Sequence, residues 1–83
     1  MKPTTEEIDH LVGSRLRYLR EERGITQAQL ASEVGITFQQ IQKYERGNNR
    51  ISASKLWLFC NIFNVLPNDF FEGLDGIARR NNA

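Results

Sequence analysis

Residues that bind metals or carry redox chemistry are scarce in this chain, which has one cysteine, Cys60, and one histidine, His10. A single cysteine excludes an internal disulfide. One cysteine and one histidine cannot supply the four ligands of a structural zinc site. The sequence also lacks a glycine-rich phosphate loop and a nucleophile elbow. We therefore expect no enzymatic activity, no metal and no cofactor.

Long apolar segments are missing as well. No apolar run reaches the roughly 18 residues that suggest a membrane span, and residues 1–7 lack the apolar stretch of a signal peptide. We therefore expect a cytoplasmic protein without a membrane partner. With 83 residues, of which 40% are apolar, the chain can form one small domain. We place this domain at residues 1–73 and expect residues 74–83 to form a polar, mobile tail.

The formal net charge is only +1, but the charges are unevenly distributed. Residues 15–50 contain seven basic and four acidic side chains, whereas residues 1–14 contain one basic and three acidic ones. A local positive surplus favours contact with nucleic acid. Because this surplus is modest, an ordinary solvated surface is the alternative explanation.

Apolar residues spaced three and four positions apart predict a first helix from about Thr5 to Arg23, which Gly24 would end. Its buried face would consist of Ile8, Leu11, Val12, Leu16 and Leu19.

Two short helices are predicted next, joined by a tight turn at Gly35. Thr26 is a good N-cap for the first of them, and Gln29, three residues later, fits a capping box. Thr37 would cap the other helix, which runs to about Glu45, and the same threonine–glutamine spacing recurs there. The inward-facing residues of the pair would be Leu30, Ala31, Val34, Ile41 and Tyr44.

The remaining sequence predicts a fourth helix from Ser52 to about Asn64 and a short fifth helix that starts at Pro67 and stops at Gly73. No segment shows the alternating pattern of a strand. The expected fold is an all-α bundle of about five helices.

Nine positions, most of them small, apolar or glycine, fall at a characteristic spacing, namely Gln27, Leu30, Ala31, Gly35, Ile36, Ile41, Tyr44, Glu45 and Gly47. This pattern resembles the helix-turn-helix core of the phage repressor/Cro (Xre) family, and the likeness covers about residues 12–73. Residues 35–56 further resemble a regulator subgroup common in α-proteobacteria, whose members often carry longer C-terminal extensions. The resemblance implies a lambda repressor-like domain that binds double-stranded DNA.

The exposed early positions of the helix that Thr37 caps are Phe38, Gln39, Gln40 and Lys43. Glutamine can pair with adenine, lysine with guanine, and an apolar group can touch a thymine methyl. We assign these four residues to DNA bases. The alternative is an ordinary solvated helix face, and Phe38 could instead fold back onto the core or contact a partner.

Residues on either side of this helix are candidates for phosphate contacts. Gln27 lies at the start of the preceding helix, where backbone N–H groups favour a phosphate, and similar proteins often use a glutamine there. The other candidates are Thr37, Asn48, Asn49 and Arg50, for which an ordinary polar turn is the alternative. The resemblance also implies a structural ion pair between Arg20 and Glu45.

The fourth predicted helix is apolar nearly all round, although a surface helix normally has a polar side. We expect Leu56, Trp57, Cys60 and Phe63 to fill the core. The surplus apolar residues Leu58, Phe59, Ile62, Leu66, Phe70 and Phe71 predict a homodimer patch. Burial under the N-terminal segment or the tail is the alternative.

The sequence therefore predicts a bacterial transcriptional regulator, a repressor or autoregulator, that reads a palindromic operator through the major groove as a homodimer. It would be located at the nucleoid when bound to DNA. The alternative from a different class is a protein-interaction module, such as an antitoxin-like dimer that holds a partner protein. No small-molecule ligand is indicated.

Overall fold

The structure, a computed structural model, describes residues 2–74. It contains four α-helices, α1 (Thr5–Glu22), α2 (Gln27–Val34), α3 (Phe38–Glu45) and α4 (Ala53–Phe63), followed by a single 3-10 turn, η1 (Pro67–Phe70). No strand occurs in this part of the chain. The all-α prediction is confirmed, but the expected fifth α-helix is only the short turn η1.

The helix boundaries follow the capping residues of the sequence. Thr26 accepts the N–H of Gln29, whose side chain bonds back to the Thr26 N–H, so the predicted capping box is present. Thr37 accepts the N–H of Gln40 at 3.2 Å, but no return bond from the Gln40 side chain forms, so this capping box is incomplete. Gly35 has a φ of 71°, a left-handed conformation that glycine adopts at little cost.

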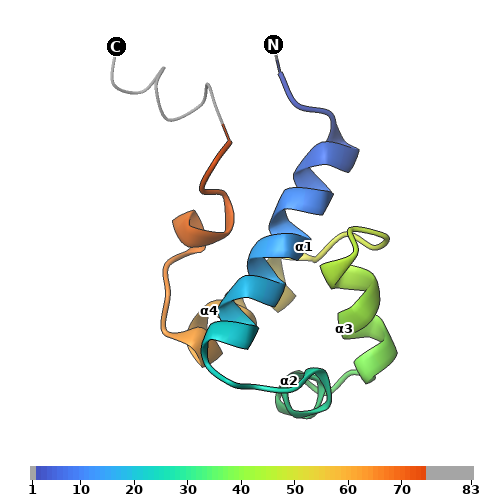
Figure 1. The fold of residues 1–83 in the computed structure, drawn as a ribbon, viewed down its shortest axis with the longest axis vertical. Coiled ribbons are helices and arrows are strands. Elements are labelled where there is room, and N and C mark those ends of the chain that lie inside the picture. The colour runs from blue at the N-terminus through green and yellow to red at the C-terminus, as the bar shows by residue number, and fades with distance from the viewer. Residues whose placement is uncertain (1, 75–83) are drawn as a thin grey trace.

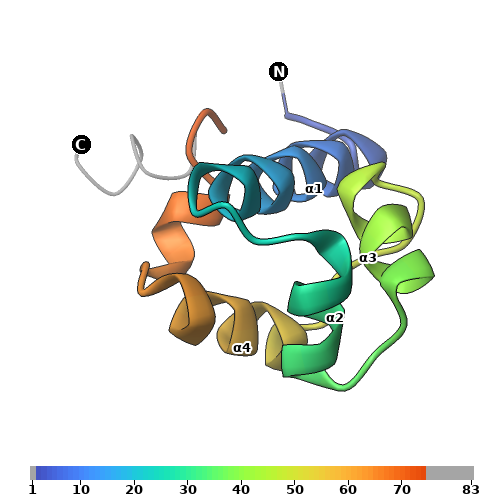
Figure 2. The same ribbon diagram turned by 60° about the horizontal axis from the view of Figure 1, so that its bottom comes forward.

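The helices surround one core (Figures 1 and 2). The long helix α1 packs against α3 on one side and against α4 and η1 on the other, and α2 contacts both α3 and α4. The fully buried side chains at the centre are Leu16, Leu30, Ile41, Phe59 and Phe70. Each of the four helices contributes one of the first four side chains, and η1 contributes Phe70, so the core joins all the elements.

Phe59 connects α3 to the rest of the core. Its ring packs edge-on against Tyr44 of α3, with 6.2 Å between ring centroids, and lies parallel to Phe63 at 6.4 Å. Phe59 therefore supports Tyr44 on the inner face of α3, and Phe63 stacks against Phe59 within α4.

The predicted roles of several apolar residues in the C-terminal third are wrong. Phe59 and Phe70, assigned to the dimer patch, are 0% exposed, whereas Trp57, assigned to the core, is 61% exposed. On a helix, Trp57 lies about 200° around the axis from Phe59, so only one of them can face the core. The buried stripe consists of Phe59, Cys60 and Phe63, with Leu56 and Ile62 partly buried beside it.

Of the other four residues of the predicted patch, Leu58, Leu66 and Phe71 are exposed, whereas Ile62 is partly buried against the core. No described helix is both long enough and apolar enough to cross a membrane. Of the predicted tail, the described part is Leu74, whose N–H bonds to the Phe71 carbonyl. Residues 75–83 lie outside the described residues.

Candidate nucleic-acid interface

Helix α3 has one buried face and one polar, exposed face. Ile41 and Tyr44 are buried in the core. Gln39 and Lys43, one turn apart, are exposed on the opposite side, Phe38 is 44% exposed, and Gln40 is half-buried. The four residues assigned to base contacts therefore include three whose side chains are exposed and a fourth that is partly accessible.

The C-terminal end of α3 is anchored by the ion pair between Arg20 and Glu45. Two guanidinium nitrogens of Arg20 donate to the two carboxylate oxygens of Glu45, at 2.7 Å and 3.0 Å. The Arg20 guanidinium also donates to the Ile25 carbonyl, at 2.8 Å. These hydrogen bonds to Glu45 raise the pKa of Arg20 above its ordinary value. With side-chain exposures of 10% and 4%, the pair is largely shielded from water.

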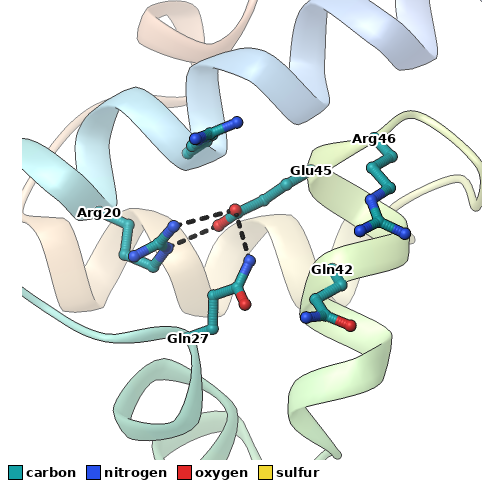
Figure 3. A pocket seen from close by; sticks show the side chains of 6 residues that line it. Arg20, Gln27, Gln42, Glu45 and Arg46 are labelled. Carbon is teal, nitrogen blue, oxygen red and sulfur yellow. Dashed lines mark hydrogen bonds and ion pairs between the residues drawn. The ribbon is translucent and has the colours of Figure 1, made fainter.

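Gln27 joins this network from α2. Its amide nitrogen donates to a Glu45 oxygen at 3.0 Å, as Figure 3 shows. Arg20, Gln27 and Glu45 thus link α1, α2 and α3 through side chains alone. An amide nitrogen carries two hydrogens, so Gln27 keeps one for a further acceptor.

The loop after α3 is held by backbone bonds and by one ion pair. The N–H groups of Asn48 and Asn49 donate to the Lys43 carbonyl, at 2.9 Å and 3.4 Å, which leaves their exposed side chains at the surface. Arg50 instead pairs with Asp9 of α1, with distances of 3.1 Å and 3.2 Å to the two carboxylate oxygens. The hydrogen bond to Asp9 raises the pKa of Arg50. Sequence reasoning had missed Asp9, because the two residues are far apart in the chain.

Two other basic residues, Arg15 of α1 and its C-cap residue Arg23, have different surroundings. Arg15 donates to the Asp69 carbonyl and pairs with Glu72, and Arg23 donates to the Phe63 and Leu19 carbonyls. Both arginines therefore hold the C-terminal segment and do not face α3. Among residues 2–74, Lys43 and Arg46 take part in no ion pair. The local positive surplus seen in the sequence is thus only partly available to a ligand.

Residues 16–70 match the helix-turn-helix family model HTH_3. An uncharacterized HTH-type transcriptional regulator of Sinorhizobium medicae is 51% identical over 69 residues, which are 83% of this chain and 50% of that protein. The chain therefore spans about half the length of this relative. The restriction-modification controller protein C.AhdI from Aeromonas hydrophila superposes with a TM-score of 0.70 at 27% identity, covering 75% of this chain and 94% of that one.

A more distant relative is the antitoxin PezA of Streptococcus pneumoniae, 31% identical over 55 residues, or 66% of this chain and 35% of that protein. The family match covers most of the described helices. The matched residues also include the capped pair α2–α3 and the Arg20–Glu45 ion pair that fixes it. The chain belongs to the HTH_3 family of helix-turn-helix proteins, the phage repressor/Cro (Xre) type.

Proposed function

We propose that this domain is the DNA-binding part of a bacterial transcriptional regulator and reads its operator by placing α3 in the major groove. The observation that carries the proposal is the polar outer face of α3, a helix that is capped at its first turn and tied to α1 at its last residue. Thr37 caps the first turn, and Glu45 is held by Arg20 at the last residue of the helix. A recognition helix needs such support because base contacts depend on orientation.

Gln39, Gln40 and Lys43 carry the hydrogen-bonding groups that distinguish base pairs in this groove. A glutamine side chain pairs with adenine and a lysine with guanine. Phe38 begins the helix and is exposed, so it can contact a thymine methyl or a sugar.

Phosphate contacts would position the domain on either side of the groove. Thr37 uses its hydroxyl oxygen as an acceptor for the Gln40 N–H, so its O–H remains available to a phosphate, as does the second amide hydrogen of Gln27. Asn48 and Asn49 offer exposed amides beyond the other end of α3. Arg50 could join them only by leaving or sharing Asp9.

A single domain of this kind reads half of a palindromic site, so we propose a homodimer. The exposed apolar residues Trp57, Leu58, Leu66 and Phe71 support self-association through the C-terminal third of the domain. A bound dimer occludes the DNA it covers, which favours repression, including that of its own promoter.

Selection of duplexes from a randomised pool by the full chain tests the proposal. We expect a two-fold consensus whose binding weakens steeply as salt rises. Alanine at Gln39, Gln40 or Lys43 should relax the preference at one position of each half-site, by about 1–3 kcal/mol. Lys2→Ala, at an exposed position that precedes α1, is the control. Failure to select any consensus would reject base reading.

The match to a pneumococcal antitoxin favours one second candidate, a module that holds a partner protein. In that case the exposed apolar residues of α4, and not the outer face of α3, would bind the partner protein and so determine the activity of the protein in the cell. Trp57→Ser would then abolish the activity, whereas Lys43→Ala would leave it intact. For an operator-binding regulator, Lys43→Ala should impair the activity, and Trp57→Ser should impair it only to the extent that it weakens dimerisation.

A further inference from the structure

A polar depression of about 440 Å³ opens between α1, the start of α2 and the C-terminal half of α3 (Figure 3). Its lining consists of Arg17, Arg20, Gln27, Gln42, Glu45 and Arg46. All six side chains are polar, three of them are arginines, and one is acidic. A lining of this kind suits an anion and offers nothing to an apolar ligand.

The single carboxylate of the depression does not oppose an anion strongly, because it is already neutralised. Glu45 accepts two bonds from Arg20 and one from Gln27. Within this network, the positive charge of Arg20 and the negative charge of Glu45 offset each other. The positive charge that remains comes from Arg17 of α1 and Arg46, the C-cap residue of α3.

Both of these arginines are accessible. Arg46 is exposed and has no ion-pair partner among the described residues. Within residues 2–74, Arg17 forms an ion pair only with Glu21, at 3.1 Å, and the two side chains are 64% and 54% exposed. Exposed pairs of this kind contribute little to stability, so Arg17 can exchange Glu21 for another anion at small cost.

The position of the depression relative to the base-reading face indicates which anion it meets. Gln42 and Arg46 are four residues apart and share one face of α3. They lie about 60° around the helix from the row that contains Gln39 and Lys43. Figure 3 places Gln42 and Arg46 on α3, across the depression from Arg20 and Gln27. When the Gln39–Lys43 row faces the bases, the next row faces the wall of the groove, which is formed by backbone phosphates.

We infer that this depression binds one phosphate of the DNA backbone, with Arg17 and Arg46 as its charged ligands and the Gln42 amide as a neutral donor. The inference rests on the proposed function and extends it to a contact in which α1 takes part. Guanidinium groups bind phosphate oxygens through paired, charge-assisted hydrogen bonds. Two arginines from different helices would fix the angle at which α3 enters the groove.

The test uses the full chain and a duplex chosen by selection. Arg17→Ala and Arg46→Ala should each weaken binding by about tenfold or more, and the double variant should lower the slope of log affinity against log salt by about 0.9. The preferred sequence should not change, because a phosphate contact weakens all sequences alike. Glu21→Gln should strengthen binding a few-fold by removing the competing anion of Arg17.

Lys2→Ala is the matched control, since it also removes one exposed positive charge, beyond the opposite end of α1 and about 18 Å or more along the helix axis from Arg17. Thermal unfolding checks that each variant folds. A set of duplexes, each with one methylphosphonate linkage, locates the contact. At the contacted phosphate, the neutral linkage should weaken the wild-type protein but not the double variant.

Two results would overturn the inference while leaving the proposed function intact. One is that the arginine variants bind like Lys2→Ala, with the wild-type salt dependence. The other is that every neutral linkage weakens the double variant as much as the wild type. If the wild-type protein binds no duplex specifically, the proposed function fails first and the phosphate contact fails with it.

Discussion

Gly13 of α1 lies directly against the backbone of α3 at Tyr44. A Cβ atom added to Gly13 would overlap the Tyr44 carbonyl oxygen and would lie 3.1 Å from the Glu45 carbonyl oxygen. Both obstacles are main-chain atoms, which cannot rotate away as a side chain can. The absence of a side chain at Gly13 therefore sets the distance between α1 and the C-terminal half of α3.

Gly13→Ala should destabilise the domain although alanine is the better helix former. The gain in helix propensity is about 1 kcal/mol, and the forced shift of the α3 backbone should exceed it, for a net loss of about 1–3 kcal/mol. Ser14→Ala, at the next and exposed position of α1, controls for propensity and should not destabilise. Chemical denaturation measures the free energy of unfolding of both variants. Equal stability of the two variants would show that α1 and α3 move apart to accommodate the added methyl group without cost.

Replacing one partner of the Arg20–Glu45 pair should destabilise the domain more than replacing both partners. Arg20→Ala leaves a carboxylate that is 4% exposed with only Gln27 as a side-chain partner, and we expect a loss of about 3–5 kcal/mol in the free energy of unfolding. Glu45→Ala should lower the free energy of unfolding by a similar amount, because it leaves the Arg20 guanidinium without its carboxylate partner. The double variant should lose clearly less than the sum, because no unpaired charge remains. Additive losses in this cycle would argue against a coupled pair.

The local structure of the helix-turn-helix could be predicted from the sequence because short-range signals determine it. Thr26, Thr37 and Gly35 act within three residues of their own positions, and the inward side chains of α2 and α3 follow the helical repeat. The Arg20–Glu45 pair followed only from the family resemblance, because the two residues are 25 positions apart.

The long-range features that were not predicted depend on tertiary structure. An apolar helix such as α4 offers several possible buried stripes, and only its neighbours decide that Phe59 faces inward and Trp57 outward. The pairing of Arg50 with Asp9 spans 41 positions, and nothing in either local sequence indicates it. The close approach at Gly13 likewise depends on where α3 crosses α1, which no periodicity of α1 reveals.

Phe59 and Trp57 should respond very differently to truncation. Phe59→Ala removes a fully buried ring that contacts Tyr44 and Phe63, so we expect a loss of about 3–5 kcal/mol. Because a domain of this size is only marginally stable, Phe59→Leu provides a milder variant that remains folded. Trp57→Ala should change stability by only about 0.5 kcal/mol. Comparable losses at the two positions in thermal unfolding would mean that Trp57 is also part of the core.

Burial of Cys60 gives a second measure of the same core. The thiol is 5% exposed, and burial raises its pKa above the ordinary value. Because the thiolate is the reactive form, a thiol reagent should modify Cys60 slowly in the folded protein and rapidly in denaturant. Phe59→Leu, which loosens the packing beside Cys60, should speed the reaction, whereas Trp57→Ala should not. Fast labelling of the wild-type protein would contradict the observed burial.

Self-association should depend on exposed residues and not on the two buried phenylalanines first assigned to the dimer patch. Leu66 is 68% exposed, so Leu66→Arg should leave the fold intact while placing a charge in any interface that includes it. Sedimentation equilibrium should then show weaker dimerisation than in the wild type, and binding to a two-fold operator should weaken more than binding to an isolated half-site. Trp57→Ser should act in the same direction. If both variants remain dimeric, the dimer interface lies elsewhere. If the wild-type protein is monomeric at high concentration, it does not self-associate, and two independent domains would bind a two-fold operator.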